Sequence, residues 1–234
     1  MLGLGWLDIV CYCIGLVEFV KCFPLVYHIR VIALLLYHGV STVCRGGGFR
    51  RPTDAEATHH LVTLCDLDWN LHQNNSTYAL EADIVRYSWF VRFLGGPRGD
   101  LLGFWRRGWT LANGGVAHYF YKELRLHQSY TIQTRLAGFD NKWLYLSTEF
   151  CSGGTLHAAG LSRIVVKRGK LTLTPKEVME SLGYSSEDVD ALRGTGNGGG
   201  GGGGLFTQIA EELRGARGAP QSGAKEATEE SKRA

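Results

Sequence analysis

Hydrophobic residues recur with two different periods along this chain, and the change of period predicts its main elements. From Asn75 to Leu94 the apolar residues follow helical spacing. They form one stripe: Tyr78, Ala82, Val85, Trp89 and Phe93. The run from Thr58 to Cys65 is short and apolar, which predicts a strand before this helix. From Trp109 onward apolar and polar residues alternate, which predicts strands with one buried face.

The alternating part of the chain divides into strands joined by tight turns. The predicted strands are Val116–Glu123, Tyr130–Leu136, Trp143–Phe150 and Thr155–Lys167. Asp140-Asn141 and Ser152-Gly153-Gly154 supply residues that favour turns between them. One strand, one long helix and then a run of antiparallel strands indicate the α+β class.

Two capped helices and a flexible tail are predicted after the last strand. Thr174-Pro175-Lys176-Glu177 is a capping box with proline at the first helical position, and Ser185 to Asp188 repeats the cap. The glycine run at 198–204 indicates a linker. We therefore divide the chain into an apolar helical anchor (1–44), a linker (45–56), a folded domain with its C-terminal helices (57–192), a glycine-rich linker (193–204) and a short helix with a disordered tail (205–234).

The first 40 residues are strongly apolar but are broken by charges. The interrupting residues are Asp8, Glu18, Lys21 and Arg30. Each would cost about 2.5–3.5 kcal/mol at the centre of a spanning helix. We expect a membrane anchor, either one span ending near Lys21 or two interfacial helices split by Pro24, with the active domain on the cytoplasmic side. The alternative is a helical pair packed on the domain. If the segment is only an anchor, deleting Met1–Val40 leaves an active soluble domain.

Composition excludes some classes of protein. The formal net charge is +3, and Lys and Arg are scattered without interleaved aromatic residues, so no nucleic-acid partner is indicated. The six cysteines make no Cys-x-x-Cys pair, and their irregular spacing favours reduced thiols over a disulfide framework. No histidine pattern has metal-ligand spacing, so neither a metal nor another cofactor is expected.

Candidate chemistry is concentrated in the connection between the first strand and the helix. The residues Asp66 to Tyr78 read Asp-Leu-Asp-Trp-Asn-Leu-His-Gln-Asn-Asn-Ser-Thr-Tyr. Free amide groups at a helix start donate hydrogen bonds and carry partial positive charge. A carboxylate beside them can attack a carbonyl or activate water while the amides hold the oxyanion, which suits acyl transfer. The simpler interpretation is that Asp and Asn here only form turns and caps.

The ordered string Asp-x-Asp-x-x-x-His-x-Asn-Asn-x-x-Tyr, followed by Glu81 on the helix, resembles the signature of hotdog-fold acyl thioesterases of the 4-hydroxybenzoyl-CoA thioesterase type. The similarity covers roughly Ala57 to Gly169 and is closest to membrane-anchored relatives and to thioesterases of fungal biosynthetic clusters. It implies an antiparallel sheet wrapped around one long helix. One departure is Leu71, because many relatives have glycine just before the histidine.

The resemblance assigns roles to individual residues. It maps the catalytic carboxylate to Asp68, four residues before His72, as nucleophile or base. Asp66 is a second catalytic candidate that shares a strand face with Asp68 if the chain stays extended. His72 either orients Asp68 or caps the turn. The candidates for substrate binding are Asn74, Asn75, Tyr78 and Glu81.

The expected function is hydrolysis of an acyl thioester carried by coenzyme A or by a carrier protein, in a homodimer or tetramer at a membrane. The first alternative is a catalytically weak acyl-binding or scaffold protein, which a tunnel narrowed by Leu71 would favour. The second is a hotdog hydratase or dehydratase, whose typical Asp-x-Asn-Pro-x-His is missing between Asp66 and His72.

Overall fold

The computed structural model describes residues 25–45, 51–96 and 101–193, together with five separate positions near the N-terminus. Those positions are Trp6, Cys11, Cys13, Gly15 and Leu16. The helices are α2 (Val26–Arg45), α3 (Asn75–Gly95), α4 (Leu101–Arg106), α5 (Pro175–Leu182) and α6 (Ser186–Arg193), and η1 (Leu64–Asp66) is a 3₁₀ helix. The strands are β1 (Glu56–Leu61), β2 (Trp109–Phe120), β3 (Ser129–Phe139), β4 (Leu144–Ser152), β5 (Thr155–Arg168) and β6 (Leu171–Leu173). The predicted glycine linker and tail lie outside the described residues.

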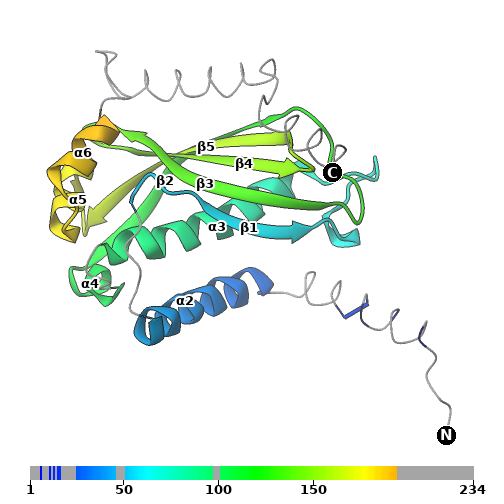
Figure 1. The fold of residues 1–234 in the computed structure, drawn as a ribbon, viewed down its shortest axis with the longest axis horizontal. Helices are drawn as coiled ribbons and strands as arrows, with labels where there is room; N and C mark the ends of the chain where they lie inside the picture. Colours follow the sequence, from blue (N-terminus) through cyan, green and yellow to red (C-terminus); the bar gives the residue numbers. More distant parts are fainter. Residues whose placement is uncertain are drawn as a thin grey trace, which may run out of the picture.

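One antiparallel sheet curls around helix α3. The strand order is β1-β3-β4-β5-β2, and β6 pairs with one end of β5. Shifts of register within β2, β3 and the β4–β5 pair mark bulges, which bend strands and increase their twist. Figure 1 shows the sheet arched over α3, with α5 and α6 at one end. The expected α+β fold, a sheet wrapped around one long helix, is therefore confirmed.

The apolar stripe predicted on the long helix faces the sheet. Tyr78, Ala82, Val85, Trp89 and Phe93 are all less than 5 % exposed. Tyr78, Ala82 and Val85 lie in one cluster of buried side chains, which also contains Phe150 of β4. Trp89 and Phe93 lie in a second cluster, which also contains Leu144 at the start of β4. Burial of this stripe fixes which face of α3 meets the sheet, and so fixes where the residues at its N-terminus lie.

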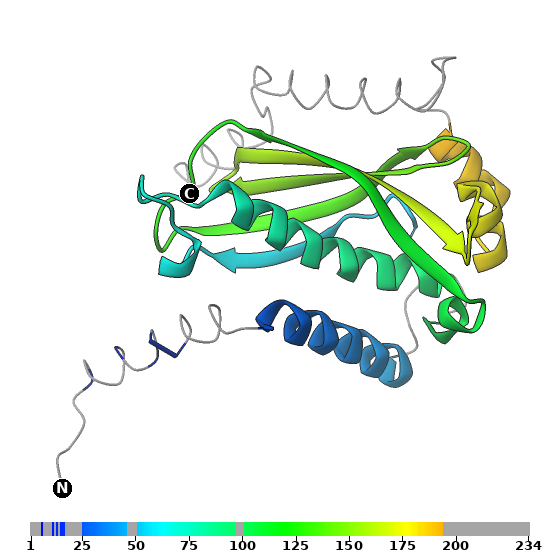
Figure 2. The same cartoon turned by 180° about the vertical axis from the view of Figure 1, so that it is seen from behind.

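Helix α2 forms a third layer on the other side of α3. Both views show α2 running beside α3, with α3 between α2 and the sheet (Figures 1 and 2). Within the described residues, no helix combines the length and the hydropathy needed to cross a bilayer. The interpretation of α2 as part of an anchor stays a prediction, but the helix also contacts the domain.

The outer edge of the sheet is held by an aromatic contact. The backbone of Gly114 in β2 passes so close to the Trp143 ring that an added Cβ would lie 2.1 Å from a ring atom. The guanidinium of Arg163 lies over the same ring, 4.9 Å from its centroid, and Nε donates to the Gly114 carbonyl at 3.0 Å. The Trp143 indole, directly before β4, and the Arg163 guanidinium of β5 thus both contact strand β2 at Gly114.

Three expectations from the sequence need correction. The first strand ends at Leu61 rather than Cys65, because Leu64–Asp66 turns into a 3₁₀ helix capped by Thr63. Cys65 is disulfide-bonded, so the expectation of reduced thiols is wrong at this position. Strand β2 also runs from Trp109 to Phe120, so it begins seven residues before the predicted Val116, at the point where the alternation of apolar and polar residues starts.

Candidate active site

The turn Asp68–His72 holds a carboxylate and an imidazole together at the surface. The Asp68 N–H donates to the His72 carbonyl at 3.0 Å, and the Leu71 N–H donates to the Asp68 carbonyl at 3.1 Å. These bonds bring the Asp68 Oδ2 to 3.4 Å from the His72 Nδ1. The two side chains are 25 % and 29 % exposed. The pair is therefore both fixed and reachable by a substrate.

The turn also fixes one oxygen of the carboxylate and strains one residue. The Asn70 N–H donates to Asp68 Oδ1 at 2.8 Å, which leaves the other oxygen facing His72. Leu71 has a φ of +60°, in the left-handed region that disfavours side chains with a Cβ. The glycine of many relatives at this position is explained by this backbone. The Leu71 side chain is 73 % exposed.

Asp66 does not share a surface with Asp68. Its side chain is buried and accepts hydrogen bonds from the Thr63 N–H at 2.7 Å and the Thr63 hydroxyl at 2.9 Å. The expectation of an extended chain between the two carboxylates fails because η1 ends at Asp66. The geometry gives Asp66 a capping role in this turn.

The start of helix α3 supplies a cap and a free amide. Asn74 is the N-cap, and its Oδ1 accepts from the Ser76 N–H at 2.8 Å. Asn75 is exposed, and within the described residues its N–H has no hydrogen-bond partner. Such an amide at the positive end of a helix can donate to a developing oxyanion. Tyr78 instead belongs to the core, and burial raises its pKa to about 12.

Glu81 is fully buried in an ion-pair network. Its two carboxylate oxygens accept hydrogen bonds from Arg30 of α2 at 2.7 and 2.6 Å, and one lies 3.1 Å from the Nδ1 of His60 on β1. Burial by itself would raise the pKa of Glu81, but the bonds from Arg30 and His60 outweigh it and lower the pKa to about 2. The carboxylate proposed to bind substrate is thus covered by α2 and saturated with partners.

Arg30 and His60 are not among the site residues predicted from the sequence. One signal for Arg30 was present, because it is the only Asp, Glu, Lys or Arg between Val26 and Cys44. A single cation in an apolar helix needs a buried partner or an exit to water. His60 carried no such signal, since its neighbour His59 looks the same in sequence.

A cationic recess lies next to the turn. The backbone of His72 pairs with that of Arg125 in a single antiparallel β-bridge. The residues that line the recess are Lys122, Glu123, Arg125, Gln128 and His157. Arg125 pairs with Glu123 at 2.5 Å. The recess presents two cations to solvent beside the candidate site, and neither was singled out from the sequence.

A comparison with protein-family models decides the family. Residues 62–182, slightly more than half of the chain, match the model described as the thioesterase-like superfamily. The chain belongs to this superfamily. The matched segment includes the Asp68–His72 turn, helix α3 and β2 to β6, so the turn lies inside the part that defines the superfamily.

The relatives of this chain include proteins named as thioesterases. "Thioesterase lcsJ" of Purpureocillium lilacinum is 28 % identical over 166 residues, which cover 58 % of this chain and 54 % of that protein. "Protein THEM6" of Danio rerio is 30 % identical over 130 residues, covering 54 % and 59 %. The chain thus spans little more than half the length of these relatives. One similar solved structure is that of the probable thioesterase YbaW of Escherichia coli, which is 18 % identical to this chain with a TM-score of 0.48. The similarity covers 54 % of this chain and 95 % of that one.

Proposed function

We propose that this protein hydrolyses acyl thioesters at the Asp68–His72 turn. The observation that carries the proposal is the exposed Asp68 carboxylate, held in place by the Asn70 N–H and facing His72. Membership of the thioesterase-like superfamily supports the same chemistry. In one route Asp68 takes a proton from the water that attacks the thioester carbonyl, the C–S bond breaks, and the proton passes to the departing thiolate. In the other route Asp68 itself attacks the carbonyl and expels the thiolate, which takes a proton from water, and a second water then hydrolyses the acyl anhydride on Asp68.

The other residues of the site would stabilise the oxyanion and orient the Asp68 carboxylate. The free N–H of Asn75 donates to the oxyanion as the carbonyl becomes tetrahedral. His72 holds the Asp68 carboxylate at the surface of the turn. A thiol with a pKa near ~8.5 leaves readily, so a site with one carboxylate suffices for thioester cleavage. The substrate is an acyl group on coenzyme A or on a carrier-protein pantetheine.

The test is a panel of acyl-CoA and acyl-pantetheine thioesters hydrolysed by the wild type and by Asp68→Ala. Hydrolysis that disappears in Asp68→Ala supports the proposal. Tight binding without turnover by either protein would instead indicate the acyl-binding or scaffold function. Addition of water to an enoyl-CoA would indicate the hydratase function.

We further propose that two copies of the chain pair through strand β2. This strand is at the edge of the sheet, and within the described residues nothing pairs with its free side. Val116 and Phe120 on it are 41 % and 43 % exposed. An unprotected edge strand is a template for pairing with another chain. Light scattering should give a dimer or a larger even assembly, and a fully active monomer would contradict this.

Membrane association is proposed through the outer face of α2. The exposed apolar residues on this face are Ile29, Ile32, Leu36 and Tyr37, with Leu25 directly before the helix, while Arg30 points inward to Glu81. A helix with an uncharged apolar face suits the plane of a bilayer surface. Ile29→Asp with Ile32→Asp should weaken binding to lipid vesicles. Leu171→Asp, at an equally exposed apolar residue on β6, is the matched control.

A further inference from the structure

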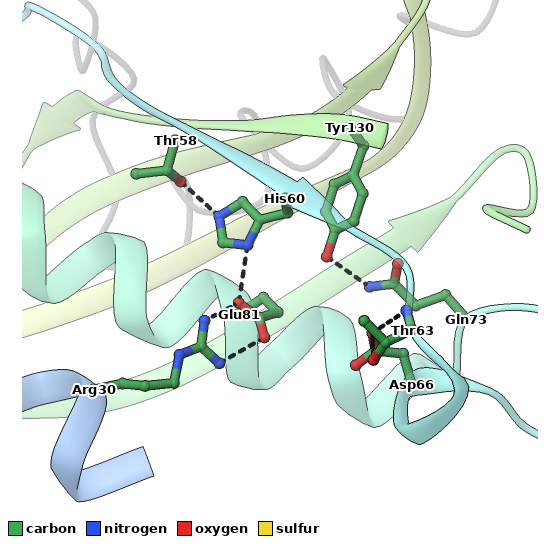
Figure 3. A network of polar contacts seen from close by, with 8 residues as sticks. All are labelled: Arg30, Thr58, His60, Thr63, Asp66, Gln73, Glu81 and Tyr130. Atoms are coloured by element: carbon green, nitrogen blue, oxygen red, sulfur yellow. Dashed lines mark hydrogen bonds and ion pairs between the residues drawn. The ribbon is translucent and has the colours of Figure 1, made fainter. Parts of the chain in front are cut away.

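A chain of buried polar contacts runs from helix α2 to the candidate catalytic turn. Its first link is the pair of hydrogen bonds from Arg30 to Glu81. The Glu81 carboxylate is 0 % exposed, so Arg30 is the cation that allows it to be charged inside the domain. Figure 3 shows Arg30 reaching from α2 to Glu81 of α3, with His60 on the opposite side of the same carboxylate.

The second link is His60. One ring nitrogen lies 3.1 Å from Glu81, and the other lies 2.7 Å from the Thr58 hydroxyl. The ring stacks on Tyr130, with centroids 5.4 Å apart and planes at 26°. Tyr130 is directly opposite His60 in the β1–β3 register. The Glu81 carboxylate thus fixes the end of β1, one residue before the chain leaves the sheet.

The third link reaches the turn itself. Tyr130 accepts a long hydrogen bond, 3.4 Å, from the Nε2 of buried Gln73, which is adjacent to His72. The Gln73 N–H donates to the Leu124 carbonyl at 2.8 Å, and Gln73 bridges to Leu67. The side chain of Gln73, directly after the turn, is therefore linked through Tyr130 and His60 to Glu81, and β1, which leads into the segment before the turn, carries His60 in the same set of contacts.

We propose that α2 is part of the catalytic unit, and that Arg30 is a positioning residue for the Asp68–His72 turn. The expected loss of kcat rests on the proposed thioesterase function, whereas the expected movement of the turn does not. Without Arg30, the buried Glu81 carboxylate keeps only the contact with His60 among the partners seen in the described residues, and the His60–Tyr130–Gln73 contacts lose their fixed end. The turn then moves relative to helix α3. Deleting Met1–Val40 would have the same effect, in contrast to the behaviour expected of a simple anchor.

The experiment compares Arg30→Met, Arg30→Lys and Tyr27→Phe in the full chain. Tyr27 is the matched control because its hydroxyl binds Asp83, so Tyr27→Phe removes an α2–α3 hydrogen bond outside the network. Hydrogen–deuterium exchange of residues 66–74 reports the turn without any substrate. Arg30→Met should raise this exchange by at least ~10-fold and lower kcat by ~10-fold with KM within about twofold, because misplacement affects the transition state most. Arg30→Lys should recover part of both, and Tyr27→Phe should change neither.

A double variant separates positioning from stability. Arg30→Met with Glu81→Met replaces the buried pair by apolar side chains, which often preserves folding. The turn should still exchange fast and kcat should stay low, because a thioether in place of the carboxylate cannot hold His60. Unchanged exchange at 66–74 in folded Arg30→Met, equal effects in Tyr27→Phe, or full rescue of kcat by the double variant would each overturn the proposal. If the wild type hydrolyses no thioester, the proposed function fails while the exchange data still decide the role of Arg30.

Discussion

The turn at Asp68 and the network at Glu81 place two carboxylates in opposite surroundings. Asp68 is partly exposed and bonds to one amide, with His72 at 3.4 Å. Glu81 is fully buried, with two hydrogen bonds from Arg30 and a third partner in His60. A carboxylate that is reachable and lightly held can react, whereas one that is buried and held by Arg30 and His60 cannot approach a substrate. The difference supports the proposal that Asp68 in the turn carries the chemistry and that the Glu81 network has a supporting role.

The strongest test of this contrast is Asp68→Asn. We expect kcat to fall by at least ~100-fold, the scale of losing a positioned base or nucleophile. The free energy of unfolding should stay within about 0.5 kcal/mol of the wild type, because the side chain is partly exposed. Steady-state kinetics on one acyl-CoA and urea unfolding measure the two effects. A wild-type rate in Asp68→Asn would move the chemistry to another carboxylate.

Asp66→Asn should show the reverse pattern. Its buried carboxylate caps Thr63 through two hydrogen bonds, so the substitution should cost about 1–3 kcal/mol of stability. The change in kcat should remain below about tenfold, since the turn itself keeps its own hydrogen bonds. The same two measurements apply. A stable but inactive Asp66→Asn would show that the capping carboxylate takes part in the reaction.

The network should also appear in the acid dependence of stability. The pKa of Glu81 is about 2 in the folded state and 4.5 ordinarily, so the unfolded state binds the proton first. Its stabilising contribution is present above about pH 4.5 and is lost as the pH falls toward 2. Arg30→Met with Glu81→Met should therefore lose less stability between these values. Urea unfolding at several pH values measures the slope, and identical slopes would contradict a charged Glu81.

The smallest expected effect sharpens the description of the turn. Leu71→Gly relieves the left-handed strain at φ +60°, whereas Leu71→Ala keeps it. We expect the glycine variant to be more stable than the alanine variant by about 1 kcal/mol, the cost of a Cβ in this conformation. Thermal unfolding of the two variants side by side measures the difference. Equal stabilities would mean that the turn relaxes when Leu71 is replaced.

Periodicity predicted the helix Asn75–Leu94, the strands from Tyr130 onward and the Thr174 capping box, because each depends on neighbouring residues. The Asp68–His72 pair also follows from local spacing. The burial of Glu81 does not, since it depends on Arg30, 51 residues away. The separation of Asp66 from Asp68 was missed for a different reason: Thr63 and Asp66 form a local cap inside what looks like a strand.

The Trp143 indole that lies on Gly114 fixes the register of strand β2 against β5. A strand must slip by two residues to keep its inward face inward. Such a slip would bring Ala112 or Val116 under the ring, where an added Cβ would already lie 2.1 Å from a ring atom. A collision between a β2 side chain and the Trp143 ring, rather than a loss of backbone hydrogen bonds, therefore excludes the shifted register. The alignment of the 12-residue edge strand β2 is therefore fixed, and so is the order of amide and carbonyl groups along its free side.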